Sequence, residues 1–533
     1  MNIYSLFNFL IYNFVYIYIL VSIINFYHCI TSFISIFILI ISAISSFFSI
    51  KFRPFRMFLF EIKYNYFLNK HILYLVFFIL AIWLFIVINR PSTGVDANVY
   101  HLPLSLLINK SVWYPGIAKL SSHFGFPNGA SVLASVFTSF DHAGFEGIPS
   151  IVTWIIYGIG IFLYLVKNHI SAFTSLIITW MFLITPEIFL ASYTMGTDLP
   201  CACFLTFGLM AIDSRKFEDT CLFFSLSAIF KTLGVLAFFM AIPYVLYMLI
   251  RKDGKRFIWT PKVLLSLVLL AISLLRVYIA TGNPIYPAIP INLMAPWGIS
   301  QDIQNDIIYG AYGKYTGGGR GLKNYAGIER TLSGVVMFMI KFFVSPHGVK
   351  SGYWFSPFFA ICLITSFLII VKEKNFRFVN VNFFYTYFII SILTLSWMSY
   401  SPLFRFISGV LVYINIKLFI FVYIKKYNIY KIINILTLYI LVSLFSFNLY
   451  EKIDAEILPL INADQKKIES FMPWSGSRKS MAKIFTIEQT EGGFAYSKST
   501  TNYCQRMPPP CINGRSLDNE KILIQLYRMY NDL

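Results

Sequence analysis

The chain has 533 residues, of which 57% are hydrophobic and only 13% are charged, and its mean hydropathy is +0.68. So few charges cannot cover the surface of a water-soluble protein of this length, which predicts an all-α polytopic membrane protein. In such a protein, the net charge of +19 is typical of basic cytoplasmic loops and does not indicate a nucleic-acid-binding surface.

A membrane-spanning helix needs about 20 apolar residues. The N-terminal segment lacks a basic region and a small-residue cleavage site, so we expect it to be retained as a span. One short segment, 220–232, is also compatible with a re-entrant or tilted element. The thirteen candidate spans are residues 3–25, 29–50, 71–89, 149–166, 171–191, 198–213, 220–232, 234–250, 262–280, 353–371, 382–398, 404–423 and 431–449.

The basic loops between these spans agree with one topology. If the N-terminus is cytoplasmic and thirteen spans follow, every basic loop falls on the cytoplasmic side and the C-terminus lies outside. The spans were chosen by hydropathy alone, so this agreement supports them. These loops contain Lys or Arg at 51–70, 167–169, 213–219, 251–256, 372–377 and 425–431.

The same topology divides the chain into three parts. We expect residues 1–70 to form two N-terminal spans and a cytoplasmic loop. Residues 71–449 would form the transmembrane core, with large outer loops at 90–148 and 281–352. The tail, 450–533, is long enough for a small extracytoplasmic domain.

Two shorter features belong to the outer face. Residues 129–140 are apolar but too few to span, which predicts an interfacial or re-entrant helix. Cys504 and Cys511 lie seven residues apart around QRMPPP in the polar tail. An oxidising compartment would favour a disulfide between them, whereas the spacing lacks the further ligands of a zinc site.

Several charged residues are expected near the outer ends of the spans. Charges are expensive at membrane depth and are kept there mostly for function or for mutual pairing. A carboxylate can accept a proton or hold a divalent metal, and Lys or Arg can hold a phosphate. The residues are Asp96, Asp198, Lys231, Arg276 and Arg405.

Each of these residues also has a simpler interpretation. Asp96 and Asp198 precede helical segments, where aspartate is a favoured N-cap residue. The lysine and the two arginines could extend to the lipid headgroups as interface anchors. His101 follows Tyr100 but has no second histidine at ligand spacing, so we do not expect it to bind a metal.

Four motifs of the chain resemble those of bacterial GT-C glycosyltransferases, which are multi-spanning enzymes that use polyprenyl-phosphate-linked sugars. The resemblance covers most of residues 71–410, and residues 112–137 are similar to a largely uncharacterised branch of such proteins. The motifs are DANVYHLP at 96–103, TDLP at 197–200, FKTLG at 230–234 and GNPIYP at 282–287.

The resemblance implies a function and a set of site residues. It implies an inverting transferase in the bacterial cytoplasmic membrane that moves a sugar from a polyprenyl-phosphate carrier to a cell-surface glycan or glycolipid. Asp96 matches the presumed catalytic base of the family. The residues expected to bind substrate are Tyr100, His101, Asp198, Lys231, Arg276, Asn283, Tyr286 and Arg405.

Two features depart from the family pattern. The family often has a paired acidic motif in the first outer loop, but here Asp96 is followed by Ala97 and Asn98. No metal ligand is therefore assigned, and a divalent metal stays an open alternative. The two spans before residue 70 also exceed the usual arrangement.

Two other functions remain as alternatives. A glycan polymerase or ligase would act through Arg320, Arg330 or His347 of the second outer loop. A lipid-linked glycan flippase or an envelope-complex component would not be an enzyme. A transporter usually carries ionisable residues at mid-membrane depth, and the sequence places few there.

Overall fold

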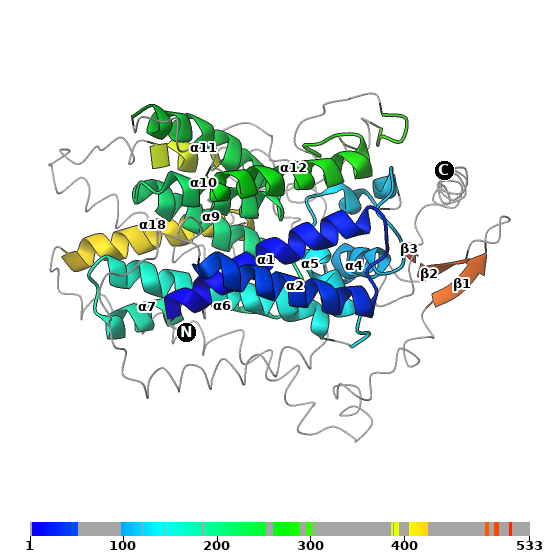
Figure 1. The fold of residues 1–533 in the computed structure, drawn as a ribbon, viewed down its shortest axis with the longest axis horizontal. Coiled ribbons are helices and arrows are strands. Elements are labelled where there is room, and N and C mark those ends of the chain that lie inside the picture. Colours follow the sequence, from blue (N-terminus) through cyan, green and yellow to red (C-terminus); the bar gives the residue numbers. More distant parts are fainter. Residues whose placement is uncertain are drawn as a thin grey trace, which may run out of the picture.

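The computed structural model describes a mostly helical chain, as the composition predicts. Figure 1 shows the long helices side by side, with short elements gathered at one end. The residues described are 3–51, 97–119, 121–142, 144–183, 186–251, 260–287, 295–300, 304, 385–386, 388–393, 404–424, 485–489, 495–499 and 511–513. The principal α-helices are α1 (Ile3–Asn25), α2 (Ser32–Lys51), α4 (Leu102–Ile108), α5 (Gly129–Thr138), α6 (Ile148–Lys167), α7 (Ala172–Leu183), α8 (Pro186–Ser192), α9 (Asp198–Asp213), α10 (Phe217–Ala228), α11 (Thr232–Arg251), α12 (Pro261–Thr281) and α18 (Phe404–Ile424).

The first two helices form an antiparallel hairpin whose second member has two chemically distinct faces. The buried face of α2 carries mainly serines, and its exposed face carries large apolar side chains such as Phe33 and Phe37. Small residues let the backbones of membrane helices approach closely, while large apolar side chains suit contact with lipid. Both helices match predicted spans, 3–25 and 29–50.

Short elements occupy the stretch between α2 and α6. They are the π-helix η3 (Ala97–His101), α4, the 3-10 turns η4 (Ile117–Lys119) and η5 (Ser122–Gly125), α5, and the 3-10 turn η6 (Phe145–Gly147). Nearly every residue of α5 is buried. The predicted short helix at 129–140 is therefore present as α5 and packed inside the protein, while the choice between an interfacial and a re-entrant position stays a prediction.

Helix α9 lies at the centre of the bundle, with every residue from Leu199 to Ile212 buried. The Thr206 hydroxyl joins three helices, because it contacts the Tyr157 hydroxyl of α6 at 2.7 Å and donates to the Gly409 carbonyl of α18 at 2.9 Å. A Cβ atom at Gly409 would lie 2.5 Å from the Ala202 carbonyl oxygen. Glycine at this position permits the close approach of α18 to α9.

Three of the described ion pairs lie at one end of the bundle, which we call the ionic end. There the buried Lys262 of α12 contacts Asp219 of α10 at 2.7 Å. Asp213 at the end of α9 accepts from Lys417 of α18 at 2.6 Å and from the Tyr164 hydroxyl of α6 at 3.0 Å. Helices α6 and α9 therefore end at the same side of the bundle at which α10 and α12 begin. The predicted topology requires this arrangement, because it places the loops 167–169 and 213–219 on one side.

The opposite end, which we call the loop end, holds Asn25, the short elements from η3 to η6, and the last turn of α12. Figure 1 shows these elements at the right of the molecule. The strands β1 (Phe485–Gln489), β2 (Ala495–Ser499) and β3 (Cys511–Asn513) lie at the same end. They form a sheet in which β1–β2 is antiparallel and β2–β3 parallel. This sheet in the tail is an element that the all-α prediction did not include.

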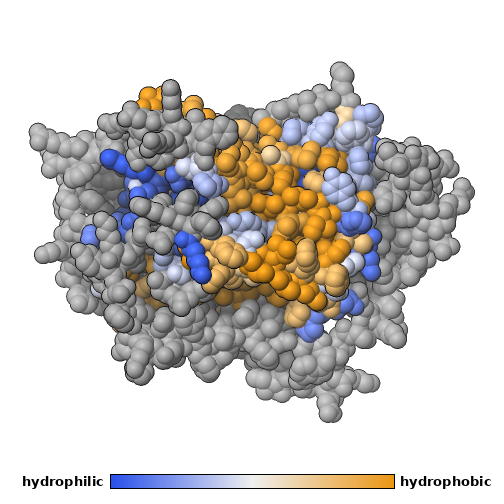
Figure 2. Space-filling model, in the orientation of Figure 1, coloured by the Kyte–Doolittle hydropathy of each residue, from blue (hydrophilic) through white to orange (hydrophobic). Residues whose placement is uncertain are grey.

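An apolar band crosses the middle of the molecule. Figure 2 shows hydrophobic residues across the centre of the visible face, with hydrophilic residues towards both ends. Four described helices are long and apolar enough to cross a membrane: Tyr4–Asn25, Ser32–Lys51, Phe145–Lys167 and Pro261–Thr281. The chain thus has the apolar helices of a membrane protein, while the count of thirteen spans and their orientation stay predictions.

The other predicted spans have different outcomes. The segments 198–213, 234–250 and 404–423 correspond to α9, α11 and α18, and 220–232 corresponds to the short α10. Of the segment predicted at 171–191, the helices α7 (Ala172–Leu183) and α8 (Pro186–Ser192) are described, and residues 184–185 between them lie outside the described residues. Of 382–398 only 385–386 and 388–393 are described, as helix, and 71–89, 353–371 and 431–449 lie outside the described residues.

Candidate functional site

Seven of the nine predicted site residues lie at the loop end with described side chains. Asp96 lies outside the described residues, one position before η3 begins. Arg405 is in the first turn of α18, where the backbone alone is described. Cys504 is outside the described residues and Cys511 opens β3, so the predicted disulfide stays a prediction. The seven are Tyr100, His101, Asp198, Lys231, Asn283, Tyr286 and Arg276, the last of which is buried against Asn25 and Trp113.

Asp198 and Lys231 form an ion pair between two helix starts. Asp198 opens α9, where a negative charge interacts favourably with the helix dipole. Lys231 immediately precedes α11 and closes the turn that follows α10, since its N–H donates to the Ser227 carbonyl at 3.2 Å. The side chains are 17% exposed for Lys231 and 25% for Asp198. The pair is therefore partly accessible to solvent or to a ligand.

Four rings from three segments make a continuous row beside this region, which we call the aromatic chain: Tyr100, His123, Phe126 and Tyr286. The Tyr100 and His123 rings stack with centroids 4.8 Å apart. The His123 ring meets the Phe126 ring edge-on at 5.4 Å, and the Phe126 and Tyr286 centroids are 5.6 Å apart. Rings at such separations attract one another beyond the area that they bury.

Two hydrogen bonds hold the aromatic chain and the ion pair together. The Thr232 hydroxyl, next to Lys231, donates to the Tyr286 carbonyl at 3.4 Å. The Gly129 N–H at the start of α5 donates to the Ile229 carbonyl at 2.8 Å. Both contacts join the turn that carries Lys231 to the segments that carry the rings. The ion pair and the aromatic chain are thus parts of one region of the loop end.

The segment that follows Asp96 packs against the same region. Ala97 and Leu102 form a small buried cluster with Ala134 of α5 and Met195. Met195 lies three residues before Asp198, in the connection between α8 and α9. The chain neighbour of Asp96 is thereby fixed beside the connection that leads to Asp198.

Three predicted substrate-binding residues are buried within this region. His101 is 2% exposed, and its Nδ1 atom lies 3.3 Å from the Ser131 hydroxyl. Asn283 donates to Gln304 Oε1 at 3.1 Å and accepts from the Ile285 N–H at 3.0 Å, so both ends of its amide stabilise the turn after α12. Burial raises the pKa of the Tyr286 phenol above its ordinary value, so this group stays neutral to a higher pH than an exposed tyrosine does. In this structure these three residues are therefore part of the packed interior of the region.

His123 and Phe126 were not among the residues predicted from sequence. Both lie in the stretch 112–137, which was noted for its resemblance to relatives, but neither carries a charge or a second ligand at metal spacing. Their role emerges only when η5 brings them between Tyr100 and Tyr286. Among the described residues, no group of three His, Cys, Asp or Glu could hold a metal ion, and this leaves the question of a metal open for the rest of the chain.

The comparisons with known proteins identify a family without a described activity. A family model described as "Domain of unknown function (DUF8201)" matches residues 2–412. This match covers more than half of the chain, which therefore belongs to that family. No curated protein and no solved structure matches the chain.

Proposed function

We propose that this member of the DUF8201 family is a membrane glycosyltransferase. It would transfer a sugar from a polyprenyl-phosphate-linked donor to a glycan or glycolipid acceptor at the extracytoplasmic face of a bacterial cytoplasmic membrane. The proposal starts from the order of four motifs, DANVYHLP, TDLP, FKTLG and GNPIYP, along the chain. It requires that these motifs meet at one site.

The observation that carries the proposal is the meeting of all four motifs at the loop end. TDLP and FKTLG contribute the two members of the ion pair, Asp198 and Lys231. GNPIYP contributes Tyr286, whose carbonyl accepts from Thr232 of FKTLG. DANVYHLP contributes Tyr100, which reaches Tyr286 through His123 and Phe126. The motifs lie far apart in the sequence, and their meeting in one region is what a shared substrate site requires.

The chemistry of these groups suits a lipid-phosphate donor. A half-buried lysine stabilises the charge that develops on a phosphate leaving group, and Lys231 is the described cation of the site. Asp198 keeps this ammonium paired in the absence of substrate, so an incoming phosphate would replace or share the carboxylate. Asp96 would accept the proton of the acceptor hydroxyl, and the partly exposed rings of the aromatic chain would border the sugar.

The test is the substitution Asp96→Asn, which keeps the side-chain size and removes the basic carboxylate. We expect transfer from a polyprenyl-phosphate sugar to fall at least about a hundredfold, since loss of a general base typically costs this much. Product would be measured by mass spectrometry of lipid-extracted glycan, with purified protein in nanodiscs. Transfer at the wild-type rate by a folded Asp96→Asn protein would refute the catalytic assignment.

Asp141→Asn is the matched control for this substitution. Asp141 is an exposed carboxylate at the same end, and its positive φ of 58° is one that asparagine adopts readily. This variant should transfer sugar at the wild-type rate. If the wild-type protein moves the lipid-linked sugar across the bilayer without forming a glycosidic product, the transferase proposal fails in favour of the flippase.

A further inference from the structure

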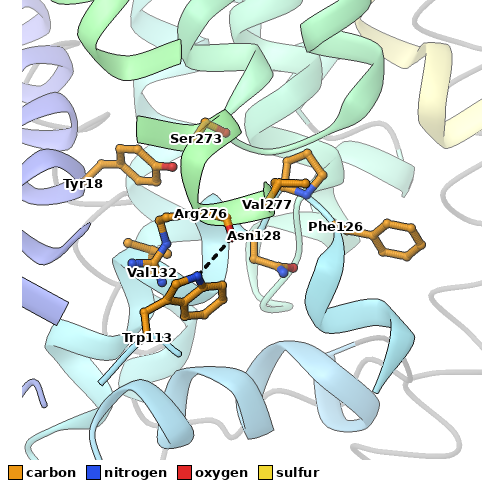
Figure 3. Close-up of a pocket in the computed structure, with 9 residues that line it drawn as sticks. Tyr18, Trp113, Phe126, Asn128, Val132, Ser273, Arg276 and Val277 are labelled. Atoms are coloured by element: carbon orange, nitrogen blue, oxygen red, sulfur yellow. Dashed lines mark hydrogen bonds between the residues drawn. The ribbon is translucent and has the colours of Figure 1, made fainter. Parts of the chain in front are cut away.

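Arg276 has an environment unlike that of the other predicted substrate-binding cations. It lies in the last turns of α12 and is 4% exposed. Its guanidinium carbon is 3.9 Å from the centre of the Trp113 ring and 5.8 Å from that of Phe26. Its Nη2 atom donates to Asn25 Oδ1 at 3.4 Å. Figure 3 shows the guanidinium beside the Trp113 ring, with the Tyr18 side chain nearby. The side chain thus contacts both α1 and the first outer loop.

The space beside Arg276 is too small for the phosphate that the sequence analysis assigned to it. The cavity that it lines with Tyr18, Trp113 and Ser273 has a volume of about 10 Å³, which is roughly that needed by one water molecule. The Nη1 atom has no hydrogen-bond partner among the described residues. A guanidinium gains more from an aromatic face when it is removed from water, so the Trp113 ring offsets part of the cost of burying this charge.

Trp113 and Asn25 complete a set of contacts around the arginine. The Trp113 indole N–H donates to the Arg276 carbonyl at 3.0 Å, and the Trp113 backbone N–H donates to the Asn25 carbonyl at 2.8 Å. The Asn25 amide in turn donates to the Ser111 carbonyl at 3.0 Å. Each of the three residues therefore contacts the other two, and together they join α1, the first outer loop and α12.

The loop continues from Trp113 along the end of α12 to the aromatic chain. The Gly116 N–H donates to the Ile279 carbonyl at 2.9 Å, one turn beyond Arg276. Further along, Gly125 packs so closely that an added Cβ would lie 2.3 Å from Thr281 Cγ2 and 2.9 Å from the Tyr286 ring. His123 and Phe126 flank this last contact. The position of the loop on α12 thus sets the position of two rings of the aromatic chain.

We propose that Arg276 is a positioning residue, which with Asn25 and Trp113 forms a latch that fixes the first outer loop on α12. The latch holds His123 and Phe126 in line with Tyr100 and Tyr286. It also gives the N-terminal helix α1 a part in the site. The inference rests on the proposed function for its link to transfer, but the latch itself is a property of the fold.

The first measurement follows hydrogen exchange of the backbone amides of Trp113 and Gly116 in nanodiscs, because it needs no activity. In Arg276→Leu we expect both amides to exchange at least about tenfold faster than in the wild type, since the loop opens locally more often. Arg215→Leu removes an exposed arginine at the ionic end and should leave both rates unchanged. Unchanged rates in a folded Arg276→Leu protein would overturn the latch.

The second measurement separates positioning from phosphate binding. A positioning role predicts that kcat falls about tenfold or more in Arg276→Leu, while the Kd of the polyprenyl-phosphate sugar stays within about twofold. Arg276→Lys should recover little, because an ammonium lacks the planar group that lies on the Trp113 ring. A Kd raised tenfold with kcat unchanged would instead make Arg276 a donor ligand and refute the proposal.

Milder variants keep the test decisive if Arg276→Leu does not fold. Trp113→Phe keeps an aromatic face and removes the indole donor, and Asn25→Ala removes the amide. Each should speed exchange at Gly116 and lower kcat with the donor Kd unchanged, and the double variant should show less than the sum of the two effects. If the wild-type protein transfers no sugar, the proposed function fails, while the exchange rates still decide the latch.

Discussion

Asp198 and Lys231 form an ion pair although 33 residues separate them in the sequence. Tyr286 lies next to the turn that carries Lys231, and its hydroxyl has no hydrogen-bond partner among the described residues. The first two residues were predicted on the same face because hydropathy placed each at the same end of its span. Their pairing could not be predicted, because it depends on the length of the short helix α10. The place of His123 in the aromatic chain could not be predicted for a similar reason, because the rings that it contacts are brought to it by the fold.

The unpartnered hydroxyl of Tyr286 leads to a prediction about stability. Burial without a partner costs about 1–3 kcal/mol, so Tyr286→Phe should leave the free energy of unfolding unchanged or raise it by up to this amount at pH 7. The raised pKa adds a separate pH dependence. The phenol loses its proton more readily in the unfolded chain than in the folded protein, so folding is more stable below the unfolded pKa than above it. That stability is lost as the pH rises above about 10.

The variant should therefore lose less stability than the wild type between about pH 9 and 11, the range in which unfolded tyrosines titrate. Unfolding midpoints in detergent, measured for both proteins over this range, check the prediction. Tyr27→Phe is the control, because Tyr27 is 75% exposed and its hydroxyl is accessible to water. A larger alkaline loss in Tyr286→Phe than in the wild type would contradict the expected sign.

At the scale of elements, the apolar segments of the sequence predicted most of the long helices that the structure describes. The segments 3–25 and 198–213 match α1 and α9, because each has clear ends: the turn that follows Asn25, and Asp198 and Asp213 themselves. Of the segment 171–191, which was predicted as one span, residues 172–183 and 186–192 are described as helix, and the two residues between them lie outside the described part of the chain.

The role of α1 could not be inferred from sequence. The first two spans seemed additional to the family pattern, yet Asn25 at the end of α1 contacts Arg276 and the first outer loop. The motifs that carry the resemblance all follow residue 71. The contact between Asn25 and Arg276 joins residues 251 positions apart, so no local sequence pattern predicts it. Arg276 was predicted from sequence to bind substrate, because its neighbours Asn25 and Trp113, which support the positioning role proposed above, are brought to it only by the fold.

The ion pair between α10 and α12 allows a prediction at the element scale. The Lys262 side chain is fully buried, and the Asp219 side chain is 1% exposed. Lys262→Met would leave the aspartate buried without its cation, which we expect to lower the free energy of unfolding by about 3–5 kcal/mol. Lys417→Met breaks a pair whose members are 34% and 25% exposed, so its cost should be about 1 kcal/mol or less.

Unfolding of both variants by denaturant in detergent micelles gives the comparison. The double variant Lys262→Met with Asp219→Leu removes both charges and should recover most of the lost stability, since apolar replacements of buried pairs are often tolerated. Glu218, 3.5 Å from Lys262 but 17% exposed, can turn towards solvent. Equal losses for Lys262→Met and Lys417→Met would show that burial does not set the cost.

At the scale of the whole molecule, the two ends differ in chemistry. The ionic end is built from paired Lys, Asp and Glu residues, whereas the loop end combines rings, turns and short helices with the tail strands. The distribution of basic loops predicts that the ionic end faces the cytoplasm. The contacts establish which helix ends lie together, but the same contacts would exist in a molecule inserted the other way. Orientation therefore has to be measured against a membrane.

Cysteine labelling measures it directly. In a variant with all seven native cysteines replaced, Tyr27→Cys places an accessible thiol in the turn between α1 and α2, because the residue is 75% exposed. His169→Cys places one at the ionic end, where the residue is also exposed. In bacterial spheroplasts, a membrane-impermeant maleimide should label Tyr27→Cys and leave His169→Cys unlabelled until the membrane is opened by detergent. The reverse pattern would place the candidate site on the cytoplasmic side, where an extracytoplasmic acceptor could not reach it, and the proposed function would fail with the topology.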